Sequence, residues 1–525
     1  MIATMLPTLL PILPAVADHA LHGVAQTRLI EAAELARQPA PPLMQRAGEA
    51  IARLALAIAP HARRVWIAAG PGNNGGDGLE AALHLQRGGR QVEVALHAGA
   101  RTPPDAQAAL RRAQAAGVSI KLGALAPQDL GELEAADLAI DALLGIGGTR
   151  APAGALAETI AQLNALRCPV LAADLPSGLD ADTGRTPGDG SAIVAQHTLT
   201  LITLKPGLFT ASGRDHAGRV WLAPLGVDPA EHADAVGPPA AWLRSLGARA
   251  PRVVRRHAQH KGSFGDVAVV GGSPGMAGAA LLAARAAHAA GAGRVYVELI
   301  AGDAGDGKLA LDLLRPELMF RADWTASSTP AALAGSTVVC GCGGGYAVRA
   351  PLPRLLSRAG RLVLDADALN TIAADAMLAD LLRARASAST VLTPHPLEAA
   401  RLLGCSTAEV QADRLRAACE LADRCRAIVV LKGSGSVVAA PGEVPNVNAS
   451  GNASLASAGT GDVLAGWIGG AWAQDAAAAK AAPPGSTLET VLRAVAEHGA
   501  AAEPERSGVL RAGDLIERLY AVVGR

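Results

Sequence analysis

Residues 459–462, Gly-Thr-Gly-Asp, place a carboxylate directly after three residues with little side-chain bulk. The apolar run over 463–468 predicts a helix that begins here. Backbone N–H groups at a helix start point outward, and small residues let several of them approach one anion. Asp462 would stand in the first turn, where it could take a proton from a hydroxyl group that attacks a phosphate. An ordinary capped helix with flexible glycines is the alternative explanation of these four residues.

Other segments of the second half could bind a nucleotide. Residues 432–436, Lys-Gly-Ser-Gly-Ser, offer an ammonium group and open amides to a phosphate. The glycine-rich loop 341–345 follows a predicted strand and could wrap a pyrophosphate. Asp365 and Asp367 stand at another strand end. His395 lies between two prolines, whose restricted φ angles would fix it for contact with a ligand, although a simple turn explains the same pattern.

In the first half, residues 70–78 join a buried strand over 63–69 to a helix that we predict from Leu79. The spacing Gly70-x-Gly72-x-x-Gly75 matches the dinucleotide fingerprint of a hydride-transferring dehydrogenase. That fingerprint needs an acid at the end of the next strand, about 20 residues on. The next predicted strand, 91–96, ends on His97 and Ala98, and Glu93 lies inside it. We therefore disfavour the dehydrogenase interpretation.

Polar residues follow the predicted strands of the first half. Asn74 and Asp77 lie in the glycine loop, Asp141 ends a strand over 137–145, and Asp174 and Ser177 follow a strand over 169–173. Carboxyl ends of parallel strands share one crevice, so we expect the side chains of Asn74, Asp141, Asp174 and Ser177 to converge there. Each acid alone has a simpler explanation as a helix cap or turn former, but all of them together indicate a site. Lys205 is a weaker candidate, because a solvated turn explains it equally.

The elements that position these residues alternate as strands and helices in both halves, which predicts two α/β domains. The chain of 525 residues is long enough for both cores. We expect a loose leader over 1–20, a first domain over 21–228, a linker rich in Pro, Ala and charge over 229–250, and a second domain over 251–525.

Composition excludes several classes of function. Lys and Arg number 47, as do Asp and Glu, so nothing suggests a nucleic-acid partner or an anionic membrane. The six cysteines lack Cys-x-x-Cys spacing, which argues against a zinc site or disulfide scaffold. The apolar start, 2–17, contains prolines and lacks a basic segment, and no apolar run elsewhere is long enough to span a membrane. We expect a cytoplasmic protein that forms a homo-oligomer.

Two motifs resemble those of known families. The run 452–466, with Asn448 upstream, resembles the signature of ribokinase-like ADP/ATP-dependent NAD(P)H-hydrate dehydratases. Residues 73–78, Asn-Asn-Gly-Gly-Asp-Gly, resemble the motif of the NAD(P)H-hydrate epimerase domain, the YjeF-type N-terminal domain. Nearly the whole chain after residue 20 therefore resembles the bifunctional NAD(P)H-hydrate repair enzymes. This implies a Rossmann-like three-layer sandwich followed by a ribokinase-like α/β domain. The family usually has proline where Cys342 stands, so this chain departs from it there.

The resemblance also implies roles for residues of this chain. In the first domain a potassium ion would be held by Asn74, Asp141 and Ser177, and Asp174 would be the catalytic acid and base. The hydrated nicotinamide would contact Asn73, Asn74, Gly75, Gly76, Asp77, Gly145, Ile146, Gly147, Gly148, Thr149, Arg150, Ala151 and Asp174. In the second domain the substrate would contact Ala279, Gly343, His395 and the catalytic Asp462. The nucleotide, with Mg²⁺ on its phosphates, would contact Lys432, Gly433, Ser434, Gly435, Ser436, Gly459, Thr460 and Gly461.

The activity implied by the resemblance has two steps. The first domain would interconvert the R and S epimers of hydrated NADH and NADPH (NADHX and NADPHX). The second would phosphorylate the hydroxyl of the S epimer with ADP or ATP, and loss of phosphate would restore NAD(P)H. One alternative is a ribokinase-like small-molecule kinase, which would release a stable phosphorylated product. A non-catalytic N-terminal binding module is the alternative for the first domain.

Overall fold

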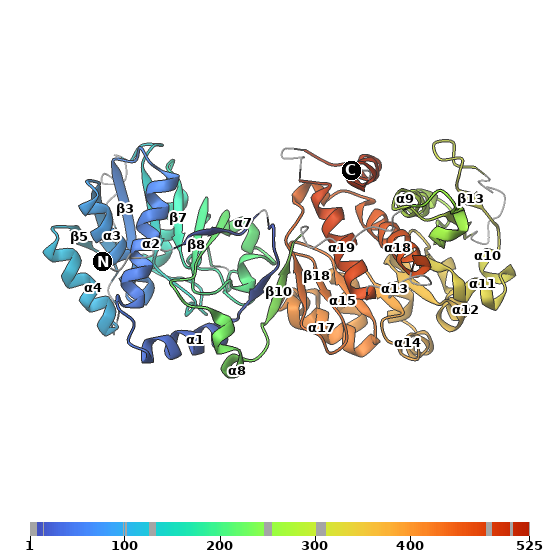
Figure 1. Cartoon of the computed structure of the whole chain (residues 1–525), viewed down its shortest axis with the longest axis horizontal. Helices are drawn as coiled ribbons and strands as arrows, with labels where there is room; N and C mark the ends of the chain where they lie inside the picture. The colour runs from blue at the N-terminus through green and yellow to red at the C-terminus, as the bar shows by residue number, and fades with distance from the viewer. Residues whose placement is uncertain are drawn as a thin grey trace. The chain divides into compact units, whose positions relative to one another are not determined.

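The computed structural model describes residues 8–13, 15–97, 99, 102–124, 133–188, 190–245, 255–300, 311–478, 486–503 and 508–523. The chain divides into two compact units (Figure 1). The main division falls between Ala241 and Trp242, inside the interval predicted as a linker, and Ala15–Asp18 belong to the second unit. That linker interval is not structureless, since it contains helix α8 (Ala233–Val236) and strand β10 (Ala241–Arg244).

The expectation of a loose leader also needs correction. Strand β1 (Leu10–Pro11) pairs with a later strand, and Ile12 is only 1% exposed.

The first unit contains a sheet in the order β1-β9-β8-β7-β6-β3-β4-β5. All of its neighbouring strands are parallel except β1, which is antiparallel to β9. The remaining strands are β3 (Arg64–Ala69), β4 (Gln91–Leu96), β5 (Ser119–Leu122), β6 (Leu138–Ala142), β7 (Val170–Ala173), β8 (His197–Leu201) and β9 (Arg219–Ala223). The short β2 (His19–Leu21) forms a bridge from Leu21 to Leu204. The connection order reverses at β3, which makes the crevice between β3 and β6 a topological switch point.

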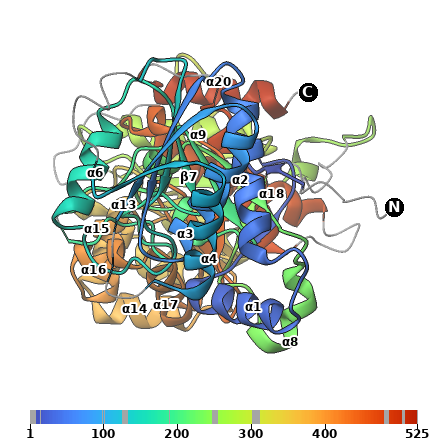
Figure 2. The ribbon, with the colours of Figure 1, turned by 90° about the vertical axis from the view of Figure 1, so that its left-hand side faces the viewer.

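Helices cover both faces of this sheet. Helices α2 (Leu43–Ile58), α3 (Asn73–Arg87) and α4 (Pro104–Ala115) lie side by side (Figure 2) and pack on one face. Helix α6 (Ala155–Asn164) packs on the other, and α1 (Val24–Ala36) and α7 (Gly213–Ala217) complete the unit. Buried side chains alternate along β3, with Ile67 in the first core and Trp66 in the second. This alternation is what a sheet covered on both faces requires.

The strands from β10 onward form a second sheet in the order β13-β12-β11-β14-β15-β16-β17-β18-β19-β10. Most pairs are parallel, but β18 is antiparallel to both β17 and β19. The strands are β11 (Asp266–Gly271), β12 (Arg294–Leu299), β13 (Met319–Phe320), β14 (Thr337–Cys340), β15 (Arg361–Leu364), β16 (Thr390–Leu392), β17 (Ile428–Leu431), β18 (Val437–Ala439) and β19 (Asn446–Asn448).

This second sheet also separates two cores. Helices α9 (Ala277–Ala289), α18 (Thr460–Ala478), α19 (Thr487–Ala500) and α20 (Ala512–Val523) cover one face. The other face carries α12 (Leu352–Arg358), α13 (Ala366–Ala373), α14 (Ala376–Arg383), α15 (Pro396–Leu403) and α17 (Arg414–Cys425). The short helices α10 (Trp324–Ser327), α11 (Pro330–Gly335) and α16 (Thr407–Ala412) lie between these elements in the chain. The predicted organisation as two α/β domains is confirmed.

Among the described residues, no helix combines the length and the apolar character that crossing a membrane requires.

Candidate active sites

The glycine loop of the first unit is shorter than we predicted, because α3 begins at Asn73 rather than near Leu79. The fingerprint glycines allow backbones to approach closely. A Cβ atom at Gly70 would lie 1.8 Å from the carbonyl oxygen of Leu143, and one at Gly75 would lie 1.9 Å from that of Gly70. Close packing of the helix start against the strand ends therefore explains Gly70 and Gly75 without a dinucleotide, whereas a Cβ atom at Gly72 would meet open space. Asn74 and Asp77 consequently stand on the first two turns of a helix.

Asn74, Asp141 and Ser177 lie together at the β3–β6 switch point, as predicted. The Ser177 hydroxyl donates to Asp141 Oδ1 at 2.6 Å, and the Ser177 amide donates to Asp141 Oδ2 at 2.8 Å. The Asn74 Nδ2 group donates to the carbonyl of Leu144 at 3.0 Å, and the Leu144 amide donates to Ser177 Oγ at 2.8 Å. Burial raises the pKa of Asp141 to about 6, although the hydrogen bonds from Ser177 and from the Leu143 amide act in the opposite direction.

Asp174 faces the same crevice from the end of β7. It has a φ of 64°, in the left-handed region that non-glycine residues seldom adopt. Its Oδ2 atom would lie 3.6 Å from a Cβ atom at Gly145, so the carboxylate borders the 145–151 loop. Backbone strain of this kind is common at functional sites, where surrounding contacts hold the residue in place.

Lys205 supplies the strongest of those contacts. Its side chain is 1% exposed, and its ammonium group donates to Asp174 Oδ1 at 2.6 Å. It also donates to Thr200 Oγ1 at 3.0 Å and to the Leu201 carbonyl at 2.8 Å. The explanation of Lys205 as a solvated turn residue is therefore wrong. The sequence interpretation underestimated this residue because its partner lies 31 positions away in the chain.

Other sequence candidates of the first unit have different surroundings. Asp77 is half-buried near Asp174 and Glu31, and loss of hydration followed by these charges raises its pKa well above the usual value. Burial, followed by Asp174, also raises the pKa of Glu31, a residue of α1 that we did not predict. Arg28, from the same helix, lies beside Gly147. The loop residues Gly147, Thr149, Arg150 and Ala151 are exposed, as is Asn73, whereas Gly75 and Gly76 are buried and Ile146 and Gly148 are half-buried.

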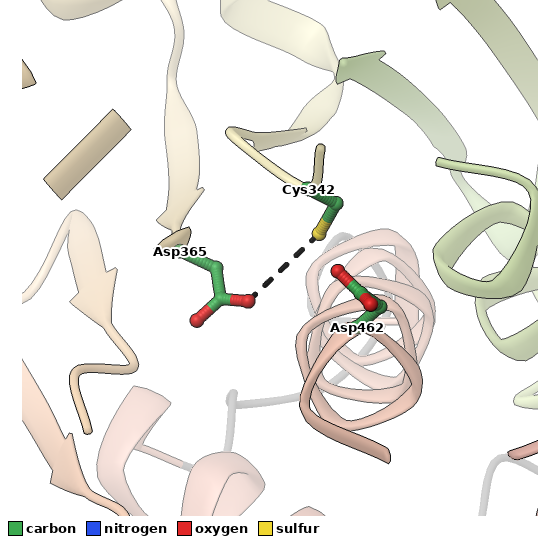
Figure 3. A group of neighbouring side chains, drawn as sticks. All are labelled: Cys342, Asp365 and Asp462. Carbon is green, nitrogen blue, oxygen red and sulfur yellow. Dashed lines mark hydrogen bonds between the residues drawn. The ribbon is translucent and has the colours of Figure 1, made fainter. Parts of the chain in front are cut away.

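The second site lies where β14, β15 and β17 end and α18 begins. Asp462 stands in the first turn of α18, and Asp365 follows β15 (Figure 3). One ligand atom each from Cys342, Asp365 and Asp462 all lie within 4.8 Å of one another. Burial, with the nearby charge of Asp365, raises the pKa of Asp462 to about 6. A carboxylate with this pKa is a better proton acceptor than a solvated aspartate but is still mostly ionised at neutral pH.

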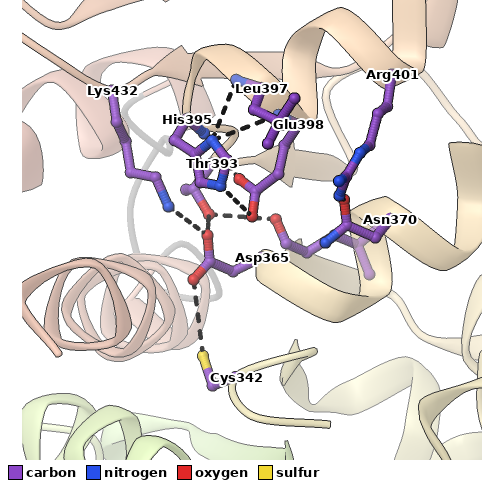
Figure 4. Close-up of polar contacts among 10 residues, drawn as sticks. Cys342, Asp365, Asn370, Thr393, His395, Leu397, Glu398, Arg401 and Lys432 are labelled. Atoms are coloured by element: carbon purple, nitrogen blue, oxygen red, sulfur yellow. Dashed lines mark hydrogen bonds and ion pairs between the residues drawn. The ribbon is translucent and has the colours of Figure 1, made fainter. Parts of the chain in front are cut away.

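Lys432 lies against this cluster. Its ammonium group donates to Asp365 Oδ1 at 2.7 Å, and Thr393 Oγ1 donates to the same oxygen at 2.8 Å (Figure 4). A Cβ atom at Gly461 would lie 3.4 Å from Lys432 Nζ, so the ammonium group also borders the first turn of α18. Because Lys432 already provides the positive charge beside Asp365, we assign no metal ion to this cluster. A phosphate at the helix start would meet both the amides and this ammonium group.

The remaining candidates surround the cluster. A Cβ atom at Gly343 would lie 3.0 Å from the Cβ atom of Ala279, so the 341–345 loop contacts the start of α9. His395 is the N-cap of α15, and its Nδ1 accepts from the amides of Leu397 at 3.1 Å and Glu398 at 3.4 Å. Capping thus explains the position of His395, and any contact with substrate stays a prediction. Burial, then Lys432, lowers its pKa.

Two supporting residues were missed. Arg414, which is 2% exposed, donates to the carbonyls of Leu431 and Lys432 at 3.2 Å each, and so fixes the start of the 432–436 loop. His498 Nε2 donates to the Thr460 carbonyl at 3.0 Å, and burial lowers its pKa to about 4, which keeps it neutral. Gly433, with a φ of 136°, packs on the Arg414 guanidinium. Neither Arg414 nor His498 could be recognised from the sequence, because each acts on a backbone carbonyl that is distant in the chain.

The two sites define a class of protein. A Rossmann-like unit with a polar switch-point crevice precedes an α/β unit in which an aspartate and a lysine flank a glycine-rich helix start. This combination indicates an enzyme with one polar site in each unit, the second of which is suited to phosphoryl transfer.

Comparison with known proteins places the chain more narrowly. Residues 41–207 match the family described as YjeF-related protein N-terminus, and residues 267–517 match the NAD(P)H-hydrate dehydratase family. The bifunctional NAD(P)H-hydrate repair enzyme Nnr of Escherichia coli K12 is 35% identical over 496 residues, which cover 92% of this chain and 88% of that protein. The enzyme of the same name from Moorella thermoacetica is 36% identical, and the match covers 88% of this chain and 87% of that protein. The chain belongs to the family of bifunctional NAD(P)H-hydrate repair enzymes.

A solved structure was also found for the second unit. It is the ADP/ATP-dependent NAD(P)H-hydrate dehydratase of Bacillus subtilis, co-crystallized with ATP/Mg²⁺. The two sequences are 28% identical, and the match covers 53% of this chain and 95% of the solved chain, with a TM-score of 0.41.

Proposed function

We propose that this chain repairs hydrated NADH and NADPH in two steps, epimerisation by the first unit and nucleotide-dependent dehydration by the second. Its family membership supports both activities, since each unit matches one half of the family. The structural observation that carries the proposal is the position of Asp462, at the start of α18 beside Lys432 and the amides of 459–461. A base and an anion site lie together there, as phosphoryl transfer to a hydroxyl group requires.

In the second unit Asp462 accepts the proton of the C6 hydroxyl as that oxygen attacks the terminal phosphorus of ADP or ATP. The P–O bond to the rest of the nucleotide breaks, and AMP or ADP departs with its electron pair. The amides at the start of α18 and the Lys432 ammonium group stabilise the charge on the phosphoryl group. Residues 433–436, held by Arg414, bind the nucleotide. Mg²⁺, when bound with the nucleotide, would supply positive charge beside its phosphates. Phosphate then departs from C6 and a proton is lost from the neighbouring ring carbon, which forms the double bond of NAD(P)H. Phosphate thus replaces hydroxide, a poor leaving group.

In the first unit Asp174 exchanges a proton at the C6 hydroxyl of the hydrate. Loss of water there gives a planar ring, and its return on either face interconverts the epimers. The Lys205 ammonium group holds the Asp174 carboxylate in its strained position beside the 145–151 loop. Asp77, whose raised pKa favours its protonated form, can donate a hydrogen bond to the substrate.

The residues proposed to hold potassium fit such an ion in one respect. Asn74 Oδ1 is buried, and no hydrogen-bond donor reaches it in the described part of the chain. A buried carbonyl oxygen without a donor is costly unless a cation or water meets it. Asp141 and Ser177, which hydrogen-bond each other beside it, would complete the oxygen ligands. A potassium ion there would offset the negative charge gathered in the crevice.

The cytoplasmic location and the homo-oligomeric state stay predictions.

The test measures recovery of NADH absorbance from a mixed-epimer hydrate, with Mg²⁺ and ADP or ATP. We expect the wild type to convert both epimers, Asp174→Asn to convert only the S epimer at an appreciable rate, and Asp462→Asn to convert neither. Phosphorylated product without free phosphate would support the small-molecule kinase instead. Unchanged epimer exchange in Asp174→Asn would remove the assigned catalytic role and favour a different acid in the crevice.

A further inference from the structure

Helix α1 is fixed against the segment that carries Lys205. Just before the helix, the His22 amide donates to the Leu204 carbonyl at 2.8 Å. Within the helix, the buried Thr27 hydroxyl shares a hydrogen bond of 2.8 Å with the Thr203 hydroxyl. Both contacts lie within two positions of Lys205, whose ammonium group pairs with the carboxylate assigned to epimerisation. The residue that follows Thr27 is therefore held close to that site.

This residue is Arg28, and its guanidinium group lies beside the 145–151 loop. A Cβ atom at Gly147 would lie 3.5 Å from Arg28 Nη2, and one at Gly145 would lie 3.6 Å from Asp174 Oδ2. Gly145 and Gly147 are two positions apart, so at most about 7 Å of chain separates them. The same short loop thus borders the carboxylate at one position and the guanidinium group at the other.

Arg28 has no ionic partner in the described part of the chain. Its side chain is exposed, and among the described residues it forms no ion pair and donates no hydrogen bond. Arg37, at the end of the same helix, differs, because it pairs with Glu34 at 2.6 Å and with Glu231 at 3.3 Å. The donors of the Arg28 guanidinium group are therefore available to a ligand.

The crevice offers a phosphate group little other positive charge. Its carboxyl groups are those of Glu31, Asp77, Asp141 and Asp174, and the Lys205 ammonium group is already paired with Asp174. The hydrated dinucleotide carries negative charge on its pyrophosphate, and hydrated NADPH carries more on a 2′-phosphate. These phosphates would be repelled by the acids of the crevice unless a cation met them.

We propose that Arg28 binds a phosphate group of the hydrated dinucleotide and thereby positions the nicotinamide ring at Asp174. The inference rests on the epimerisation proposed above. A guanidinium fork can donate two parallel hydrogen bonds to one phosphate, which fixes the direction of the ligand as well as its place. The contact lies away from the reacting atoms, so Arg28 is a positioning residue. Its phosphate is either the pyrophosphate, which both hydrates carry, or the 2′-phosphate, which only NADPHX carries.

The first experiment measures epimer exchange with NADHX and with NADPHX in wild type, Arg28→Ala, Arg28→Lys and Arg37→Ala. The assay is run at pH 8, because Arg28 lowers the pKa of Glu31 and this carboxyl group should stay ionised in every variant. We expect Arg28→Ala to raise KM about tenfold and to change kcat less than about twofold. Arg28→Lys keeps the charge but loses the fork, so its KM should lie between the two. Arg37→Ala should leave both constants unchanged.

The comparison of the two hydrates identifies the phosphate. Equal rises in KM for NADHX and NADPHX would assign the contact with Arg28 to the pyrophosphate, and a rise confined to NADPHX would assign it to the 2′-phosphate. Unchanged KM for both hydrates would overturn the proposal. A fall in kcat alone would also overturn it, because Arg28 would then support the helix or the acids rather than bind substrate.

A second measurement needs no turnover. Phenylglyoxal modifies accessible guanidinium groups, and mass spectrometry of the resulting peptides measures the labelling of each arginine separately. With NADPHX present and ADP and ATP absent, we expect Arg28 to be protected and Arg37 to be labelled as before. Equal labelling of Arg28 with and without NADPHX would contradict the phosphate contact. Should the wild type fail to exchange epimers, the proposed function of the first unit falls, while the labelling still decides whether Arg28 binds the phosphates.

Discussion

At the residue scale, the acids of both sites depend on partners that come from elsewhere in the chain. Asp174 is held by Lys205, and Asp462 stands beside Cys342, Asp365 and Lys432. In each case burial makes an unpartnered charge costly, and the neighbouring side chains offset that cost. The chemistry that we assign to each acid is therefore a property of a small set of side chains.

The pKa of Asp462, about 6, leads to a prediction on pH. Asp462 acts as a base, so only its deprotonated form is productive, and protonation below the pKa removes it. We expect kcat for dehydration to be level above about pH 7 and to fall about tenfold per unit below about pH 6. Circular dichroism over the same range checks that the chain stays folded. A level profile down to pH 5 would contradict the assignment of Asp462 as the base.

Replacement of Lys205 by methionine should damage the first site. The change removes an ammonium group that is 1% exposed and leaves the Asp174 carboxylate buried without its ion pair. Breaking a buried pair in this way typically costs about 3–5 kcal/mol, and we expect epimer exchange to fall at least about 100-fold. Urea unfolding and an epimer-exchange assay measure the two effects. The control is Lys121→Met, which breaks the ion pair between Lys121 and Glu93. The Lys121 side chain is 46% exposed and that of Glu93 is 32% exposed, so this change should cost less than about 1 kcal/mol.

At the element scale, each site forms where a helix start meets strand ends. The glycines of 70–78 let α3 approach β3 and the chain after β6, and those of 341–345 let the loop after β14 approach α9. Small residues at these positions serve backbone packing first, and that packing brings the polar side chains together. The 432–436 loop is the exception, because it joins antiparallel strands and needs a separate support.

That support is Arg414, which we expect to control nucleotide binding. Its guanidinium group donates to the carbonyls of Leu431 and Lys432 and to Gln411 Oε1. Arg414→Ala would free the loop, so KM for ADP or ATP should rise about tenfold while KM for the hydrate changes little. Arg416→Ala is the control, since Arg416 lies on the same helix with a side chain that is 60% exposed. Equal changes in both variants would show that Arg414 does not act through the loop.

At the scale of the whole molecule, each unit has its own sheet, its own cores and its own site. The residues that we assign to epimerisation all lie before Ala241, and those assigned to dehydration all lie after it. Neither site needs a described residue of the other unit, so we expect the two activities to be separable by point mutation.

The measurement of separability uses each inactive variant in the assay of the other activity. Asp174→Asn should dehydrate pure S epimer within about twofold of the wild-type rate, and Asp462→Asn should exchange epimers within the same limit. A mixture of the two variants should convert a mixed-epimer hydrate fully. Loss of both activities in either single variant would show that the sites are coupled.

Several features of this protein could be determined from the sequence by itself. The alternation of strands and helices, the two domains and the motifs at 73–78 and 459–462 are local patterns, which a reader of the chain can find without coordinates. Asn74, Asp141 and Ser177 were placed together correctly, because parallel strands bring their carboxyl ends to one edge. The start of α3 at Asn73 was not predicted, since its first turns are rich in glycine and asparagine, which locally disfavour a helix.

Only the tertiary structure decided the partners of the polar groups at the two sites. Lys205 meets Asp174 across 31 positions of sequence, Lys432 meets Asp365 across 67, and His498 meets the Thr460 carbonyl across 38. Such pairs leave no spacing that can be recognised in a single sequence. The pKa of a buried group depends on distances and burial that exist only after folding. The chemistry was therefore visible in the residue types, whereas the protonation states and supports that make it work arise from packing.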